Sequence, residues 1–238
     1  MSIYDLQDEL SKYIRQELEL YGNELAVPAS QLNAAARAST RDVVDDTEWK
    51  NATDLQSLYE AIKDCQKCSL GQQRTNFVFG TGNPNADVVL VGEAPGAEED
   101  LQGIPFVGKA GQLLDKILAA IDFSRKDVYI CNILKCRPPQ NRDPLPSEIE
   151  RCKPYLDKQL ALLNPQFILC LGRVAAQTLL NTEQSLSSLR GRVHEYGNSK
   201  LIVTYHPAAL LRYPQYKRPT WEDVQLLRRL YDEWKNKS

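Results

Sequence analysis

Four short apolar runs stand out along the chain, and they span residues 87–92, 127–135, 167–172 and 200–206. Each run is rich in β-branched residues and nearly continuous in apolar residues, without alternation between apolar and polar positions. This composition is typical of strands that are buried on both faces of a parallel sheet. We therefore predict four parallel strands.

Amphipathic segments separate the apolar runs. Residues at helical spacing predict helices over 109–121, 147–163, 173–181 and 220–236. A further helix is expected just after residue 53, with Thr53 or Asp54 as its N-cap. The alternation of strands and helices predicts an α/β protein, a three-layer α/β/α sandwich with a central four-stranded parallel sheet.

Ligands bind such sheets beyond the carboxyl ends of the strands. The segments expected at that edge are 92–111, 132–141, 172–173 and 205–212. Any functional site should therefore draw its side chains from these four segments.

The first part of the chain has a different pattern. Residues 1–20 predict one helix with an imperfect apolar stripe, and residues 24–52 show no sustained period, which is typical of a linker. We therefore predict an N-terminal helix and linker extension over 1–52 and a separate domain over 53–238. A loosely attached tail without a specific function explains the extension equally well.

Composition and charge narrow the class of protein. Apolar residues make up 42% and charged residues 25%, which is ordinary for a globular protein. No apolar run approaches the roughly 18 residues of a membrane span, and the acidic, amphipathic start has no signal-peptide pattern. We expect a cytoplasmic protein with no membrane partner. Because the net charge is −2, a nucleic acid would have to be bound by a local basic patch.

The loop after the first predicted strand is unusually acidic. It spans residues 92–114, reads GEAPGAEEDLQGIPFVGKAGQLL and contains Glu93, Glu98, Glu99 and Asp100. These carboxylates would repel a phosphate group unless a metal ion lay between them. For Glu98 and Asp100 the preferred interpretation is a pair of solvated charges at the start of a helix.

Six cysteines lie at positions 65, 68, 131, 136, 152 and 170. The first two form a C-x2-C pair, and those at 136 and 152 flank the segment CRPPQNRDPLPSEIERC. These four could hold zinc or an iron–sulfur cluster, and their spacing does not decide between the two. Four unrelated thiols remain the alternative. Cys131 and Cys170 lie inside apolar runs and are interpreted as small core residues.

Four motifs, in order and together with the cysteines, resemble the family 4 uracil-DNA glycosylases: GEAPGAEEDLQGIPFVGKAG, NILKCRPPQNRDP, LGRVAAQTLL and TYHPAALLR. The resemblance covers about residues 57–236. It implies a [4Fe–4S] cluster bound by Cys65, Cys68, Cys136 and Cys152. It also implies an enzyme of base excision repair, which hydrolyses the N-glycosidic bond of a flipped-out deoxyuridine in DNA and leaves an abasic site.

The resemblance also implies which residues bind uracil, and these are Gly92, Glu93, Ala94, Phe106 and Asn132. Phe106 would be the aromatic floor on which the flipped base stacks. Asn132 would read the base, because one amide can donate to O4 and accept from N3–H, whereas cytosine presents the opposite pattern. Backbone groups of Glu93 and Ala94 are expected to contact the base.

Three residues are implied in the chemistry. A neutral His206 would donate a hydrogen bond to uracil O2, where negative charge develops as the bond breaks. Ala94 stands where other branches of the superfamily carry a water-activating aspartate, so Glu99 and Asn141 become the candidates for that role. Glu99 has two further interpretations: it could stabilise the cationic sugar, or crowd C5 of the base and exclude thymine.

Leu210 or Leu211 would fill the gap that the flipped base leaves, with Leu210 preferred. Basic residues near the same edge are candidates for phosphate contacts, and they are Lys109, Lys135, Arg137, Arg142, Arg173, Arg190, Arg192, Arg212, Lys217 and Arg218.

The expected partner is uracil-containing DNA, the expected state is a monomer, and other repair proteins are candidate partners. No lysine is placed for lyase chemistry, so a monofunctional enzyme is expected. The alternative hypotheses are a non-catalytic iron–sulfur or zinc DNA-binding member of the same superfamily, and a zinc-stabilised nucleotide-binding module.

Overall fold

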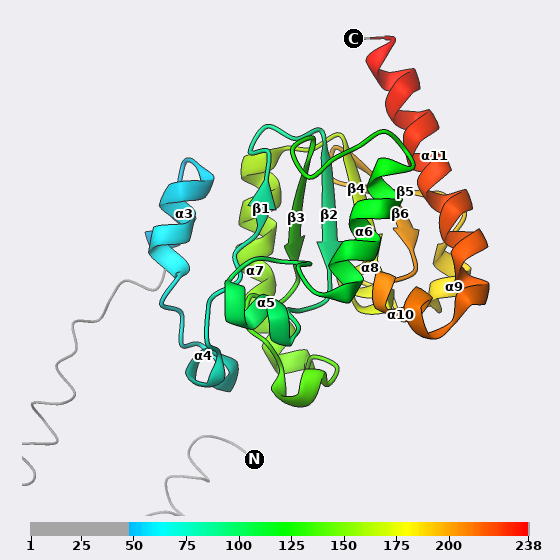
Figure 1. Cartoon of the computed structure of the whole chain (residues 1–238). Coiled ribbons are helices and arrows are strands. Elements are labelled where there is room, and N and C mark those ends of the chain that lie inside the picture. The colour runs from blue at the N-terminus through cyan, green and yellow to red at the C-terminus, as the bar shows by residue number, and fades with distance from the viewer. Residues whose placement is uncertain (1–47, 238) are drawn as a thin grey trace, which may run out of the picture. The chain divides into compact units, whose positions relative to one another are not determined.

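The computed structural model describes residues 48–237, which contain a six-stranded sheet (Figure 1). The strands are β1 (Thr81–Gly82), β2 (Val88–Gly92), β3 (Val128–Asn132), β4 (Phe167–Leu171), β5 (Val193–Tyr196) and β6 (Ser199–Thr204). Their order across the sheet is β1-β3-β2-β4-β6-β5. The central strands β3, β2, β4 and β6 pair in parallel, as predicted, and β1 and β5 add antiparallel pairs at the two edges.

The two edge strands were not predicted, because neither resembles a doubly buried strand. β1 has only two residues. β5 alternates between exposed and half-exposed side chains and is joined to β6 by a two-residue turn. Gly197 in that turn has a φ of 55°, a left-handed conformation that suits the tight turn of a hairpin.

The longer helices cover the two faces of the sheet, which gives the three predicted layers. Successive residues of a strand point to opposite faces. On one face α6 (Lys109–Ala119) and α11 (Lys217–Lys235) pack with Val88 and Leu90 of β2. On the other face α7 (Pro146–Leu163) and α8 (Arg173–Leu180) pack with Val89 and Val91. The predicted α/β/α architecture is confirmed.

The remaining elements are short. They are η2 (Glu48–Asn51), α3 (Leu55–Ile62), α4 (Ser69–Gln73), α5 (Ala97–Gln102), η3 (Pro139–Asn141), α9 (Leu186–Leu189), α10 (Pro207–Arg212) and η4 (Pro214–Tyr216). The carboxyl ends of the central parallel strands point toward α5 and α10 (Figure 1). This edge of the sheet is where the sequence places a functional site.

The start of the described chain is packed against α7. Asp54 is the N-cap of α3, where its carboxylate accepts a hydrogen bond of 2.7 Å from the backbone N–H of Ser57. Just before it, the ring of Trp49 lies edge-on to Tyr155, with centroids 5.0 Å apart. The end of the predicted linker therefore contacts the domain. The predicted helix over 1–20 and most of the linker lie outside the described residues, and the division of the chain at residue 52 stays a prediction.

No helix between residues 48 and 237 has the length and apolar character needed to cross a membrane. The cytoplasmic location stays a prediction.

Candidate active site

A cavity of about 400 Å³ opens at the carboxyl edge of the sheet. Among the predicted site residues, those that line it are Glu93, Ala94, Glu99, Phe106, Asn132, Asn141, His206 and Arg212. These side chains come from β3, α5, η3, α10 and the loops that follow β2, α5 and β6. The topology therefore brings together residues that are more than one hundred positions apart in the sequence.

Asn132 ends β3 and is almost completely enclosed, with 1% of its surface exposed. Its side-chain oxygen is buried and has no hydrogen-bond partner anywhere in residues 48–237. Leaving a buried acceptor unpaired is costly, so such a group is best explained as one that a ligand satisfies.

Gly92 makes room for this amide. It is paired with Asn132 in the β2–β3 register. A Cβ atom at residue 92 would lie 2.4 Å from Asn132 Oδ1 and 2.7 Å from Cζ of Phe106. The missing side chain therefore allows the amide and the ring to lie together at the end of the sheet.

His206 is held as a neutral imidazole. It is the N-cap of α10, and its Nδ1 accepts a hydrogen bond of 3.2 Å from the backbone N–H of Ala208. Burial lowers the pKa of His206 to about 4; the charge of Glu99 opposes this lowering and that of Arg212 adds to it. Because Nδ1 is an acceptor, the proton of the neutral ring is on Nε2. The ring centroid lies 5.4 Å from that of Phe106.

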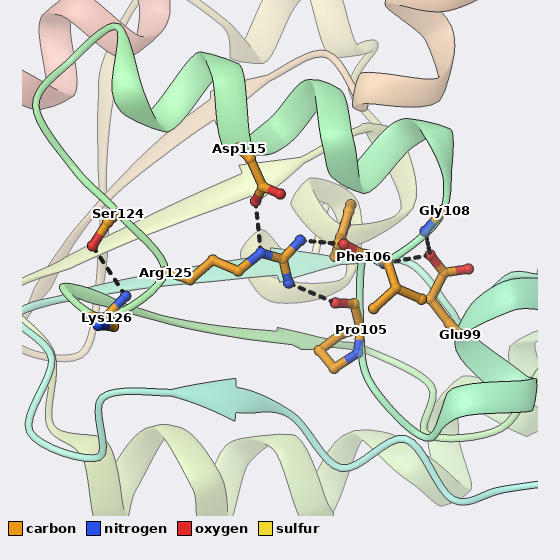
Figure 2. Close-up of polar contacts among 9 residues, drawn as sticks. Glu99, Pro105, Phe106, Gly108, Asp115, Ser124, Arg125 and Lys126 are labelled. Carbon is orange, nitrogen blue, oxygen red and sulfur yellow. Dashed lines mark hydrogen bonds and ion pairs between the residues drawn. The ribbon is translucent and has the colours of Figure 1, made fainter.

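The carboxylate of Glu99 accepts hydrogen bonds from the backbone just after Phe106 (Figure 2). Its Oε1 accepts hydrogen bonds of 2.9 Å from the N–H of Val107 and 3.0 Å from that of Gly108, the N-cap residue of α6. A carboxylate at this position also interacts favourably with the positive end of the α6 dipole. One oxygen of Glu99 therefore fixes the loop, a role that the sequence does not indicate.

Asn141 lies in η3 with a left-handed φ of 55°. Its side-chain oxygen accepts a hydrogen bond of 2.8 Å from Nε of Arg137. The guanidinium therefore holds the amide oxygen of Asn141, and the amide nitrogen is the group left to serve a ligand in the cavity.

Glu93 is partly buried, and this burial raises its pKa to about 6. The charge of Asp143 raises it further and that of Arg173 opposes the shift. The backbone carbonyl of Glu93 already accepts a hydrogen bond of 3.0 Å from the N–H of Leu134. A carbonyl oxygen has two lone pairs, so this bond leaves one of them for a ligand.

Comparison with known proteins identifies the family. A family model described as the uracil DNA glycosylase superfamily matches residues 79–226, which include every residue that lines the cavity. This chain belongs to the uracil-DNA glycosylase superfamily. The predicted family resemblance is confirmed.

Curated members of the superfamily match most of this chain. It is 48% identical to a Type-4 uracil-DNA glycosylase of Archaeoglobus fulgidus over 179 residues, which are 72% of this chain and 90% of that protein. Type-4 enzymes of Pyrobaculum aerophilum and Sulfurisphaera tokodaii are each 42% identical. Those matches cover 73% and 74% of this chain, and 92% and 84% of the relatives.

Two adjacent leucines on α10 differ in exposure, and the difference reverses the preference for Leu210 as the residue that fills the gap left by the flipped base. Leu210 is 2% exposed and packs into the protein, whereas Leu211 is 51% exposed. A side chain that enters DNA must project from the surface, so Leu210 is a poor candidate for the wedge. Leu211 takes its place in the proposal below.

Two charged residues are buried and a third is held in a buried ion pair, contrary to the sequence interpretation. Lys135 is 0% exposed and donates to the backbone oxygen of Asn132, so it cannot contact a phosphate. Arg190 is paired with the buried Asp223 at 2.7 Å. Asp100 is not solvated either: it is 5% exposed and its Oδ1 accepts a hydrogen bond of 3.0 Å from the N–H of Thr75.

All six cysteines of this chain are free thiols. Cys131 and Cys170 are 0% exposed within the core, as predicted. The other four come from three segments: the stretch between α3 and α4, the loop after β3, and α7. Within residues 48–237, no group of three or more His, Cys, Asp or Glu side chains is arranged to hold a metal ion. The predicted metal ligands therefore stay a prediction.

Three of these four sulfur atoms accept hydrogen bonds from groups that the sequence does not single out. Nη1 of Arg74 lies 3.2 Å from the sulfur of Cys136. The backbone N–H of Lys135 lies 3.4 Å from the sulfur of Cys152, and the Tyr155 hydroxyl lies 3.5 Å from that of Cys65. Hydrogen-bond donors lower the pKa of a cysteine, and cysteine binds metals as the thiolate. Burial acts in the opposite direction here: it raises the pKa of Cys136, and that of Cys152 to about 12.

Proposed function

We propose that this protein is a monofunctional uracil-DNA glycosylase that hydrolyses the N-glycosidic bond of a flipped-out deoxyuridine and leaves an abasic site. The buried, unpaired amide oxygen of Asn132 is the observation that supports this most directly. It suits the N3–H donor of uracil. Cytosine has an acceptor at that position and would leave the amide oxygen unpaired.

The neighbouring residues supply the other parts of the reaction. The base stacks on Phe106, which lies beside both Asn132 and His206. The Nε2–H of His206 donates to O2 of the uracil, where charge builds up as the base leaves. The fixed imidazole needs no reorganisation at that moment, because Ala208 already holds its other nitrogen.

The water that attacks the sugar is positioned by Glu99 or Asn141. Oε1 of Glu99 is engaged by two backbone donors, so its other oxygen is the one available. Asn141 offers its amide nitrogen, since Arg137 holds the amide oxygen. On the DNA side, Leu211 fills the space that the base leaves, and Arg212 contacts a phosphate beside the cavity. The monomeric state and other repair proteins as partners stay predictions.

A duplex with one uracil tests the proposal. Incubation followed by alkali is expected to cut the labelled strand at the uracil, and omission of alkali is expected to leave the strand intact, because a monofunctional enzyme leaves an abasic site. An identical duplex with thymine is the control. Tight binding of the uracil duplex without excision would contradict the proposal and support the non-catalytic alternative.

We also propose that Cys65, Cys68, Cys136 and Cys152 hold a [4Fe–4S] cluster. The chemistry of the side chains supports this proposal, since all four are free thiols and three of their sulfur atoms accept hydrogen bonds. Burial is the main cause of the raised pKa of Cys136, and the charges of Cys68 and Cys65 add to it, as expected of thiols that lie near one another. When bound, the cluster would join the segment between α3 and α4 to the start of α7 and stabilise the fold.

The cluster proposal predicts a brown protein that contains iron and sulfide in equal amounts. Cys152→Ser is expected to lose most of the iron and the visible absorption, and to unfold at a lower temperature. Cys170→Ala is the matched control, because Cys170 is a buried thiol of the core and is expected to keep the iron. Purified protein that contains zinc and no iron would overturn the assignment.

A further inference from the structure

The backbone at Phe106 is in an unfavourable conformation. Its φ is 55°, in the left-handed region that residues other than glycine rarely adopt. The start of α6 also lies very close, since a Cβ atom at Gly111 would be 1.8 Å from the carbonyl oxygen of Phe106. Such a conformation persists only where the surrounding structure holds it in place.

Arg125 supplies part of that support (Figure 2). Its Nη1 donates to the carbonyl oxygen of Pro105 at 3.1 Å, and its Nη2 donates to that of Phe106. Its Nε donates to Oδ1 of Asp115 on α6 at 2.6 Å, which fixes the plane of the guanidinium. Arg125 lies in the loop between α6 and β3, outside the cavity.

Four consecutive residues are thus fixed by side chains from two sides. Arg125 holds the carbonyl oxygens of residues 105 and 106, and Glu99 holds the N–H groups of residues 107 and 108. We name the set of Glu99, Asp115 and Arg125 the Phe106 clamp. An arginine suits this position because its rigid fork donates to two oxygen atoms at once, and a lysine cannot reproduce that geometry.

We propose that Arg125 is a positioning residue, which acts through Phe106 to hold the aromatic platform on which the flipped base stacks. The inference rests on the proposed function, in which Phe106 receives the uracil. Arg125 touches no substrate. Its effect is to remove freedom from the Phe106 peptide before DNA arrives, so that the base is held at the correct place relative to His206.

The chain offers a closely matched control. Nη1 of Arg228 donates to the carbonyl oxygens of Ile121 and Asp122, at 3.2 Å and 3.4 Å. Asp122 also has a φ of 55°, and Arg228 is paired with Asp232. The side chains of Arg125 and Arg228 are 28% and 30% exposed. Arg228 therefore also holds two consecutive backbone carbonyl oxygens, but it lies outside the cavity.

The test compares Arg125→Met with Arg228→Met in single-turnover excision of uracil. Arg125→Met is expected to be about 10- to 100-fold slower than the unmodified protein. Arg228→Met is expected to excise at the unmodified rate, with a similar fall in unfolding temperature. Affinity for a uracil-free duplex should be unchanged in both. Arg125→Lys is a milder variant that keeps the positive charge and loses the forked guanidinium. Its excision rate is expected to fall between those of Arg125→Met and Arg228→Met.

A double-mutant cycle shows whether Arg125 acts through Phe106. If it does, Arg125→Met should slow excision by less than about 3-fold in a Phe106→Leu background, because the platform is already lost. An equal effect in both backgrounds, or a rate for Arg125→Met that matches Arg228→Met, overturns the inference alone. Failure of the unmodified protein to excise uracil would instead overturn the proposed function, and the inference with it.

Discussion

His206→Ser is expected to slow single-turnover uracil excision by about 100- to 1000-fold, with DNA affinity nearly unchanged. The Nε2–H of the neutral ring stabilises charge that exists mainly in the transition state, so its loss should appear in the chemical rate and not in binding. Serine is too short to reach the base. Its hydroxyl can still accept the hydrogen bond from the Ala208 N–H, so the N-cap of α10 is kept.

Stability measurements separate this role from a structural one. His206→Ala lacks both the Nε2–H donor and the N-cap acceptor. It should therefore excise uracil at the rate of His206→Ser, and its free energy of unfolding should be about 1 kcal/mol lower than that of His206→Ser. A residue that only packs would give a different result, with rate and DNA affinity falling together as stability falls. A serine variant that excises within a few-fold of the unmodified rate would remove His206 from the mechanism.

The lowered pKa of His206 also predicts how stability depends on pH. The unfolded chain takes up a proton near pH 6.5, whereas the folded chain does so only near pH 4. Stability should therefore fall as the pH is lowered through this window, by up to about 1.4 kcal/mol per pH unit from this residue. The raised pKa of Glu93 acts in the opposite direction. Glu93 is present in both the unmodified protein and His206→Ser, so its contribution cancels in the comparison. As the pH is lowered toward 4, the unmodified protein should lose stability relative to His206→Ser.

Asn132→Asp is expected to reduce discrimination against cytosine by about 100-fold or more, together with a lower rate on uracil. A carboxyl group in this enclosed site would be protonated, because burial disfavours its charged form. A protonated carboxyl can place its donor and acceptor in either order. An amide has only one order once its orientation is fixed.

The measurement is single-turnover excision from matched duplexes that carry uracil or cytosine. Asn132→Leu is the control, because it has a similar size and no polar group, and it should lose activity on uracil without gaining activity on cytosine. Unchanged rate and unchanged selectivity in Asn132→Asp would show that Asn132 does not read the base.

The sequence was sufficient for the features that depend on local pattern. The central strands are nearly continuous apolar runs because both of their faces are buried, and this left a clear signal for all four. Parallel pairing then placed the ends of β2, β3 and β6 at one edge. For this reason Asn132 and His206 could be predicted to lie near the acidic loop that contains Phe106. The short, exposed strands β1 and β5 gave no such signal.

Burial and partners of single side chains were decided only by the tertiary structure. Adjacent leucines on α10 look alike in the sequence, and the packing of that helix alone buries Leu210 and exposes Leu211. Lys135 looks like a phosphate ligand until the fold encloses it. Arg125 is one arginine in a loop without a motif. Its bonds to Pro105 and Phe106 join segments about twenty residues apart, and no periodicity in a sequence records contacts of that kind.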